Sequence, residues 1–183
     1  MRAFLAIKLH SSSDIKTFYE AMKQTNGNFK PVNLDQLHLT LKFFGDIDEA
    51  KQEEISSVVR ERTRSLDPFS FRLAGCGAFP NENYLKVIWV GCLEAESLKD
   101  LGNTLQMDFA KLGFRKDNFS PHLTLFRVRS QKNKNAIQAV MAEHRETDFG
   151  EGKVGELLLI SSKLTSSGPI YSVVERFPLG KES

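Results

Sequence analysis

Two histidines head the same tetrapeptide, and they are the residues whose type and spacing could carry chemistry. Residues 38–41 and 122–125 both read His-Leu-Thr-Leu, although the chain has only four histidines. Imidazole titrates near neutral pH, so one ring can accept a proton while a second ring donates one. Threonine hydroxyls can donate hydrogen bonds to the non-bridging oxygens of a phosphate. The repeated tetrapeptide therefore indicates acid–base chemistry on a phosphodiester, a reaction that needs no metal.

The spacing within each tetrapeptide suits a strand with one polar face. Successive side chains of a strand point to opposite faces. We expect His38, Thr40 and Lys42 on one face, with Leu39, Leu41 and Phe43 on the other. His122 and Thr124 repeat this arrangement. A lone His-x-Thr is more often a structural feature than a catalytic one, but a matched pair favours function.

The elements that must position these residues follow from apolar periodicity, helix caps and glycine or proline breakers. Helices are predicted for residues 13–25, for a segment opened by Asp46, Asp48 and Glu49 and closed near Arg64, and for 98–112 and 135–144. Strands are predicted near residues 2–9, 37–44, 69–79, 84–92, 119–128, 154–161 and 170–177. The order strand–helix–strand–helix–strand therefore occurs twice.

This order predicts an internal duplication. Leu39 lies 37 residues after Arg2, and Leu123 lies 39 residues after Tyr84. A repeat of this length predicts a single α+β body of two pseudo-symmetric lobes, about residues 1–80 and 81–183. An approximate two-fold axis would bring the two polar strand faces together across a central cleft. Whether the lobes exchange strands stays open.

Composition narrows the class of protein. The 183 residues are 40% hydrophobic and 26% charged, which is ordinary for a globular protein and excludes a disordered chain. A net charge of +2 excludes a strongly basic coat. Cys76 and Cys92 form no C-x-x-C pair, which excludes a cysteine zinc site. Without a long apolar run, we expect a cytoplasmic protein that contacts no membrane. We also expect a monomer.

Three weaker signals accompany the tetrapeptides. The segment from Lys111 to Lys134 contains seven basic residues and a single acidic one, Asp117. Such an excess of positive charge would attract a polyanion. His10 and His144 lack a repeated context, and His144 is expected to lie at the C-terminal end of a helix. Several aromatic residues could include a platform for base stacking: Phe4, Phe43, Phe44, Tyr84 and Tyr171.

On these residues the chain resembles the 2H phosphoesterase superfamily, which carries the H-x-T-x motif twice. Wider segments resemble the prokaryotic RNA 2',3'-cyclic phosphodiesterases, also called 2',5'-RNA ligases. The segments are MRAFLAI at 1–7, LHLTLKFFG at 37–45, FPNENYLKVIW at 79–89, SPHLTLFR at 120–127 and GPIYSVVERFPL at 168–179. The resemblance spans nearly the whole chain.

The resemblance implies a bilobal α+β fold, in which two facing antiparallel sheets line a cleft and helices pack outside. It implies hydrolysis of RNA 2',3'-cyclic phosphate ends to 2'-phosphate ends, with neither metal nor cofactor. His38 and His122 would be the catalytic residues, and Thr40, Thr124 and Arg127 would bind the phosphate. Strict alternation puts Arg127 on the wrong face, so a bulge or strand end must rotate it inward.

Two alternatives stay open at this point. The first is ATP-independent joining of RNA ends, such as tRNA halves, through a 2',5' linkage, because the same residues would serve both directions. The second is a non-enzymatic module that binds nucleotides or RNA on the same scaffold. Which histidine acts as acid and which as base is also open.

Overall fold

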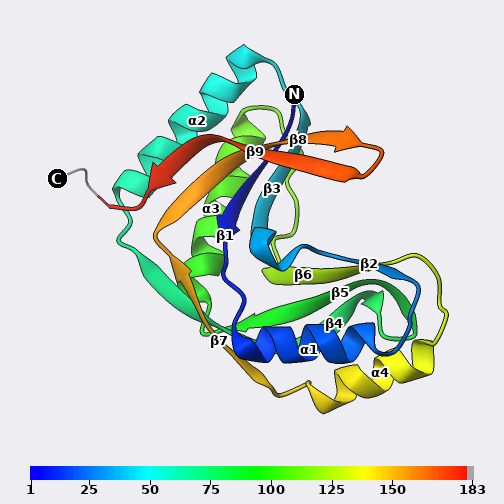
Figure 1. The fold of residues 1–183 in the computed structure, drawn as a ribbon. Helices are drawn as coiled ribbons and strands as arrows, with labels where there is room; N and C mark the ends of the chain where they lie inside the picture. The colour runs from blue at the N-terminus through cyan, green and yellow to red at the C-terminus, as the bar shows by residue number, and fades with distance from the viewer. Residues whose placement is uncertain (181–183) are drawn as a thin grey trace.

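The computed structural model describes residues 1–180, which form an α+β fold with two antiparallel sheets (Figure 1). The first sheet has the order β3 (His38–Asp46), β1 (Arg2–Lys8), β8 (Glu156–Thr165) and β9 (Gly168–Pro178). The second has the order β2 (Phe29–Pro31), β6 (His122–Val128), β5 (Tyr84–Leu93), β4 (Phe69–Asn81) and β7 (Asp148–Val154). The predicted fold class is confirmed.

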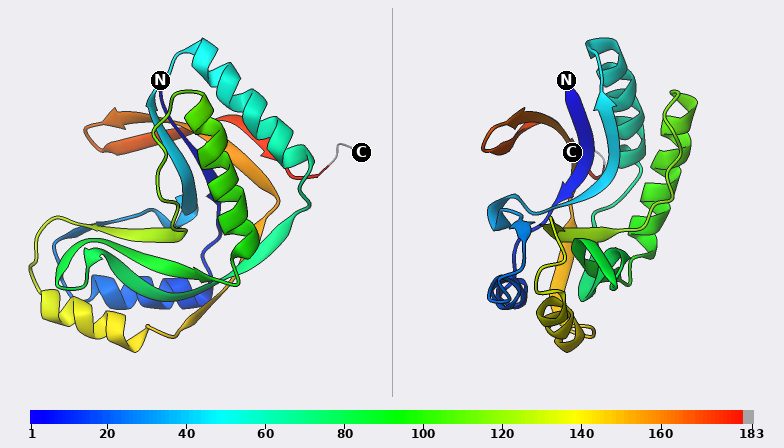
Figure 2. Two further views of the ribbon diagram at one scale, coloured as in Figure 1. Left: turned by 180° about the vertical axis from the view of Figure 1, so that it is seen from behind. Right: turned by 90° about the vertical axis from the view of Figure 1, so that its right-hand side faces the viewer.

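Helices cover the outer side of each sheet (Figures 1 and 2). Helices α2 (Glu49–Arg64) and α3 (Glu96–Lys111) lie against the first sheet, and α1 (Ser13–Lys23) and α4 (Lys134–Glu143) lie against the second. The inner sides of the sheets are left free to face each other. In residues 1–180, no helix has the length and the apolar character needed to cross a membrane.

Each sheet takes strands from both halves of the sequence. Strand β8 lies in the second half of the chain but pairs with β1, and β9 pairs with β8. Strand β4 lies in the first half but pairs with β5 and β7. The strands that carry the tetrapeptides hold similar places: β3 is the edge strand beside β1, and β6 lies between β5 and the short edge strand β2. The sheets therefore do not divide at residue 80.

The local sequence explains most of the elements. Helix α1 begins after Ser12, whose hydroxyl accepts a hydrogen bond from the amide of Ile15 at 3.1 Å. Helix α2 likewise begins after Asp48, which caps the amide of Lys51 at 2.8 Å. The apolar side chains at helical spacing in α1 are buried. These helices lie where periodicity and caps predict them.

Neither β2 nor β7 is predicted from the sequence. Strand β2 is only three residues long, and β7 has charged or glycine residues at most of its positions. Gly152 of β7 is required by close contact, because a Cβ atom there would lie 2.5 Å from Cζ of Phe71 on β4. Strand β7 follows α4 and belongs to the second sheet. The strand predicted at 154–161 comes after it and is β8 of the first sheet.

The leucines of both tetrapeptides anchor these strands in the core. Leu39, Leu41, Leu123 and Leu125 are all buried, on the side of each sheet that faces the helices. Burying a leucine side chain contributes roughly 1.5–3 kcal/mol. The same burial turns the intervening polar side chains toward the other sheet.

Candidate active site

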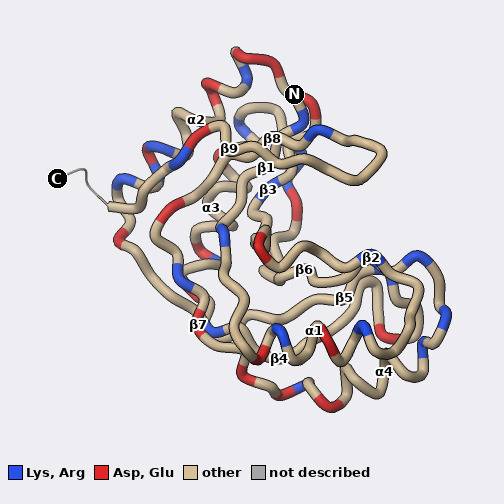
Figure 3. Tube along the Cα trace, viewed as in Figure 1, with Lys and Arg blue, Asp and Glu red and all other residues tan. Residues whose placement is uncertain are grey.

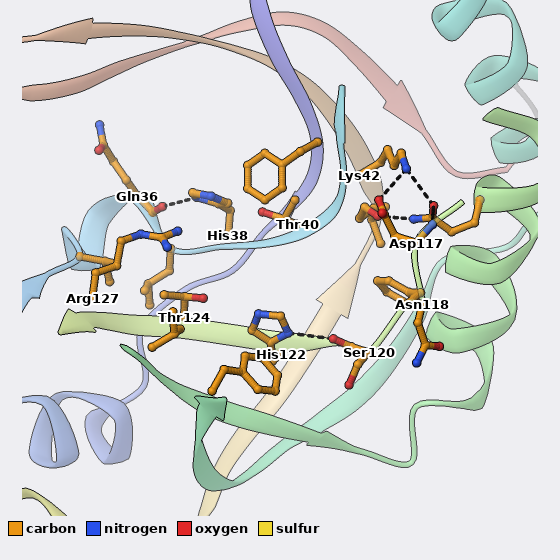
Figure 4. Close-up of a pocket in the computed structure, with 18 of the residues that line it drawn as sticks. Gln36, His38, Thr40, Lys42, Asp117, Asn118, Ser120, His122, Thr124 and Arg127 are labelled. Carbon is orange, nitrogen blue, oxygen red and sulfur yellow. Dashed lines mark hydrogen bonds and ion pairs between the residues drawn. The ribbon is translucent and has the colours of Figure 1, made fainter. Parts of the chain in front are cut away.

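One pocket of about 320 Å³ lies between the two sheets, and both tetrapeptides line it (Figure 4). His38 and Thr40 reach it from β3, and His122, Thr124 and Arg127 reach it from β6. The pocket thus contains every residue that the sequence analysis singled out as a site residue.

Each histidine is held by a carbonyl group two residues earlier in the chain. Nδ1 of His38 lies 2.9 Å from the carbonyl oxygen of Gln36, and Nδ1 of His122 lies 2.8 Å from that of Ser120. A carbonyl oxygen only accepts, so Nδ1 donates a proton in both bonds. When either ring is neutral, this bond leaves its Nε2 unprotonated and available to a substrate.

Aromatic contacts fix the planes of both imidazole rings. The ring of His122 packs edge to face against Phe79, with centroids 4.9 Å apart. The ring of His38 lies 5.0 Å from that of Phe4 and 5.5 Å from that of Tyr171. These contacts limit rotation of the imidazoles and orient them toward the pocket.

The surroundings of His38 favour its neutral form. Burial is the main cause that lowers the pKa of this imidazole, and the positive charge of Arg127 lowers it further. The hydrogen bond to Gln36 acts in the opposite direction but is outweighed. At neutral pH the His38 ring is therefore uncharged and can accept a proton.

A bulge in β6 brings Arg127 to the pocket. Thr124 pairs with Trp89 and Phe126 pairs with Ile88, so Leu125 has no counterpart on β5. The extra residue changes the alternation, and Leu125 and Phe126 are both buried. Arg127 then returns to the side of His122, and this bulge is the one that the sequence analysis required.

Strand β3 contains an equivalent bulge, which overturns one expectation. Ala6 pairs with Thr40 and Leu5 pairs with Lys42, so the intervening residue of β3 is skipped. Phe43 was expected on the apolar face, but it is 63% exposed and lines the pocket. Lys42, expected on the open polar face, is only 4% exposed. Strict alternation holds only as far as the bulge.

The pocket also contains groups that the sequence analysis missed. The carbonyls of Gln36 and Ser120 act through the backbone, so their side chains give no signal. Lys42, Gln106 and Asp117 line one end of the pocket and are linked by hydrogen bonds. A lysine directly after a tetrapeptide is visible in the sequence, but its distant partners are not.

The remaining histidine and cysteine candidates lie outside the pocket. His144 ends α4, as expected, and its Nδ1 donates to the carbonyl of Val140 at 2.9 Å. Burial raises the pKa of the Cys76 thiol to about 11 and that of Cys92 to about 12. Neither is a thiolate nucleophile at neutral pH. Within residues 1–180, no three His, Cys, Asp or Glu side chains lie together as a metal site requires.

Basic residues lie next to the arginine end of the pocket. Figure 3 shows Lys and Arg along the loop that joins β6 to α4, which contains Arg129 and Lys132. Lys30 on β2 pairs directly with Arg127 in the register of the sheet. The side chains of such a pair leave the same face. Within residues 1–180, neither Lys30 nor Arg127 forms an ion pair. This end is suited to an anion.

Comparison with known proteins then places the chain in a family. A sequence model described as the 2'-5' RNA ligase superfamily matches residues 12–165, which include both tetrapeptides. The chain belongs to the 2'-5' RNA ligase superfamily. An RNA 2',3'-cyclic phosphodiesterase of Methanothermobacter thermautotrophicus is 37% identical over 182 residues, which cover 98% of this chain and 99% of that protein.

Solved structures of similar proteins agree with this assignment. A Thermus thermophilus protein superposes with a TM-score of 0.78 at 29% identity, and the match covers all of both chains. E. coli LigT complexed with phosphate superposes with a TM-score of 0.67 at 26% identity, covering 98% of each chain. This superfamily member thus shares the fold of these proteins over nearly its whole length.

Proposed function

We propose that this superfamily member hydrolyses the 2',3'-cyclic phosphate at the end of an RNA to a 2'-phosphate. The observation that carries the proposal is the pair of imidazoles, each held through Nδ1 by a carbonyl, that line one pocket from opposite sheets. The relative named RNA 2',3'-cyclic phosphodiesterase supports the choice of substrate.

The roles of the two histidines follow from their surroundings. His38, kept neutral by burial and by Arg127, takes a proton from the water that attacks phosphorus. The bond between phosphorus and the 3' oxygen breaks, and His122 in its protonated form gives a proton to that oxygen. One P–O bond forms and one breaks. The product carries a 2'-phosphate and a free 3'-hydroxyl.

Three further side chains stabilise the charge on the phosphoryl oxygens. Thr40 and Thr124 each donate one hydrogen bond from the same walls as the histidines, and Arg127 adds a guanidinium with several donors. Donors fixed in place before the reaction stabilise the transition state without reorganisation. All five residues come from one chain, so we propose that a monomer is active.

The test is incubation of an oligonucleotide that ends in a 2',3'-cyclic phosphate with the protein in excess EDTA, followed by analysis of the RNA end. We expect a 2'-phosphate. A 3'-phosphate, or no turnover in EDTA and full turnover with a divalent ion, would contradict the proposal. A second arm supplies an RNA with a 5'-hydroxyl, and a 2',5'-linked product there identifies ligation as the preferred direction. Binding without turnover in either arm would indicate a non-enzymatic module.

A further inference from the structure

Lys42 is a buried cation at one end of the pocket whose hydrogen bonds are all made within the protein. Its side chain is 3% exposed. Its Nζ donates to Oε1 of Gln106 at 3.1 Å, to Oδ2 of Asp117 at 2.6 Å and to the carbonyl of Arg115. An ammonium group has three N–H donors, and all three are engaged. Lys42 therefore has no donor left for a phosphate, although it lines the pocket.

The partners of Lys42 connect the two sheets. Lys42 belongs to β3 of the first sheet, while Arg115 and Asp117 lie in the segment that leads from α3 into β6 of the second. Gln106 of α3 donates from Nε2 to the carbonyl of Leu41 at 3.1 Å and accepts from the amide of Asp117 at 3.2 Å. One hydrogen-bond network thus ties β3, α3 and this segment together (Figure 4).

The same segment has a second anchor closer to the catalytic residue. Phe119 packs on Gly102 of α3, where a Cβ atom would lie only 2.1 Å from Cδ1 of the phenyl ring. Ser120, which follows, provides the carbonyl that accepts from Nδ1 of His122. The network at residues 115–117 and the contact at Phe119 therefore determine the position of that carbonyl.

The other histidine is oriented by local structure instead. Gln36 ends a short 3-10 helix, Leu34–Gln36, whose first turn is capped by the side chain of Asn33. The carbonyl that orients His38 is therefore held by its own neighbours in the sequence. The segment before His122 has no helix of this kind, since residues 114–121 form no regular element.

We propose that Lys42 is a positioning residue for His122. By fixing Arg115 and Asp117, it holds the Ser120 carbonyl where it keeps the proton of His122 on Nδ1 and turns Nε2 toward the pocket. Because Lys42 lies four residues after His38 on the same strand, it also fixes His122 relative to the opposite histidine. This role rests on the proposed function only in so far as it concerns catalysis.

The experiment combines kinetics with nitrogen NMR of the imidazoles in Lys42→Met, which keeps the side-chain length and removes the charge. We expect kcat to fall about 10- to 100-fold with KM within about threefold, since a small misplacement of a catalytic group has effects of this size. The His122 signals should shift toward the other tautomer, while those of His38 stay unchanged. Wild-type kcat and wild-type His122 signals in a folded variant would overturn the proposal.

The control is Lys51→Met. Lys51 donates to the carbonyl of Leu112 at 3.1 Å and pairs with Glu54. Its contact at Leu112 comes before residues 115–120 in the chain, so Lys51 makes no hydrogen bond to the segment that Lys42 fixes. This variant loses a lysine contact to the start of the same segment, and it should keep wild-type kcat and tautomers. If it reproduces the His122 shift, general loosening explains the effect and the specific role of Lys42 is wrong.

A second variant keeps the proposal testable if Lys42→Met does not fold. Asp117 is half exposed, so Asp117→Asn weakens the network without leaving an unpaired charge in the core. We expect the same shift of the His122 tautomer, though smaller, and its absence would overturn the proposal. The NMR measurement needs no substrate. A tautomer shift in a protein whose wild type is inactive would therefore refute the proposed function and leave the role of Lys42 standing.

Discussion

Phe43 and Arg127 occupy equivalent positions, each five residues after the histidine of a repeated tetrapeptide, and both line the pocket. A bulge after the threonine brings each of them to the open face of its strand. The histidines and threonines are the same in both tetrapeptides, whereas the fifth residue after the histidine is Phe43 on β3 and Arg127 on β6. The two strands are therefore not equivalent at this position, because β3 presents a phenyl ring to the pocket and β6 presents a guanidinium.

Replacing either histidine tests the acid–base pair. We expect His38→Ala and His122→Ala each to lower kcat about 100-fold or more, because a positioned acid or base contributes roughly 10² to 10⁴. Both variants should fold, since both rings lie at the pocket rather than in the core. The control is His10→Ala, an exposed histidine outside the pocket. Near-normal turnover in either pocket variant would contradict the two-histidine mechanism.

The threonines separate phosphate binding from proton transfer. Thr40→Val and Thr124→Val keep the β-branched shape and remove one donor. We expect each change to cost roughly 2–4 kcal/mol of transition-state stabilisation, measured as kcat/KM. The limbs of the pH–rate profile should stay in place, because both imidazoles remain. Thr17→Val on α1 serves as control, and wild-type rates in the pocket variants would show that these threonines only build strands.

Arg127 should affect the pH dependence through His38. A lowered pKa means that His38 loses its proton below the usual value of about 6.5, so the acidic limb of kcat/KM should lie below that pH. Arg127→Gln removes one of the causes and should move this limb upward, although burial keeps it below the usual value. Arg127→Lys keeps the charge and should leave the limb in place. An unchanged limb in Arg127→Gln would argue against His38 as the base.

The same lowered pKa predicts a stability effect. Below the pKa of the unfolded chain, the unfolded state binds a proton that folded His38 does not, so the free energy of unfolding should decrease as the pH falls through this interval. His38→Asn should reduce that dependence. Denaturant titrations of wild type and variant between pH 7 and pH 5 measure it, and parallel curves would contradict the lowered pKa.

Lys30 should matter for RNA chains more than for a single nucleotide. It pairs with Arg127 in the sheet, and a Cβ atom on Gly168, the first residue of β9, would lie 3.0 Å from its Nζ. We expect Lys30→Gln to weaken binding of an oligonucleotide and to reduce the salt slope by about 0.7, the value for one contact to a single strand. A nucleoside 2',3'-cyclic phosphate should be unaffected. Equal losses on both substrates would show that Lys30 acts within the pocket itself.

The sequence by itself determined the two motifs and the elements that carry them. His38 and His122 are recognisable because an identical tetrapeptide recurs at matching places in the order of elements. The leucines between the polar residues are buried as alternation predicts, because an apolar–polar alternation leaves only one face for the core. Helix α1 is equally direct, since its cap and its apolar spacing are both local.

Only the tertiary structure decided how the pocket is completed. Phe43 lies on the face opposite to the one that alternation predicts, because β3 has a bulge before it. The bulge depends on the register between β3 and β1, and local periodicity carries no information about that register. The partners of Lys42 lie 64 to 75 residues away along the chain, so no local pattern can indicate them. The residue types reveal which side chains can transfer protons, but the carbonyls that orient both imidazoles belong to the backbone, which every residue shares. The local 3-10 helix places the Gln36 carbonyl, but the Ser120 carbonyl is placed only once the segment before β6 has packed against β3 and α3.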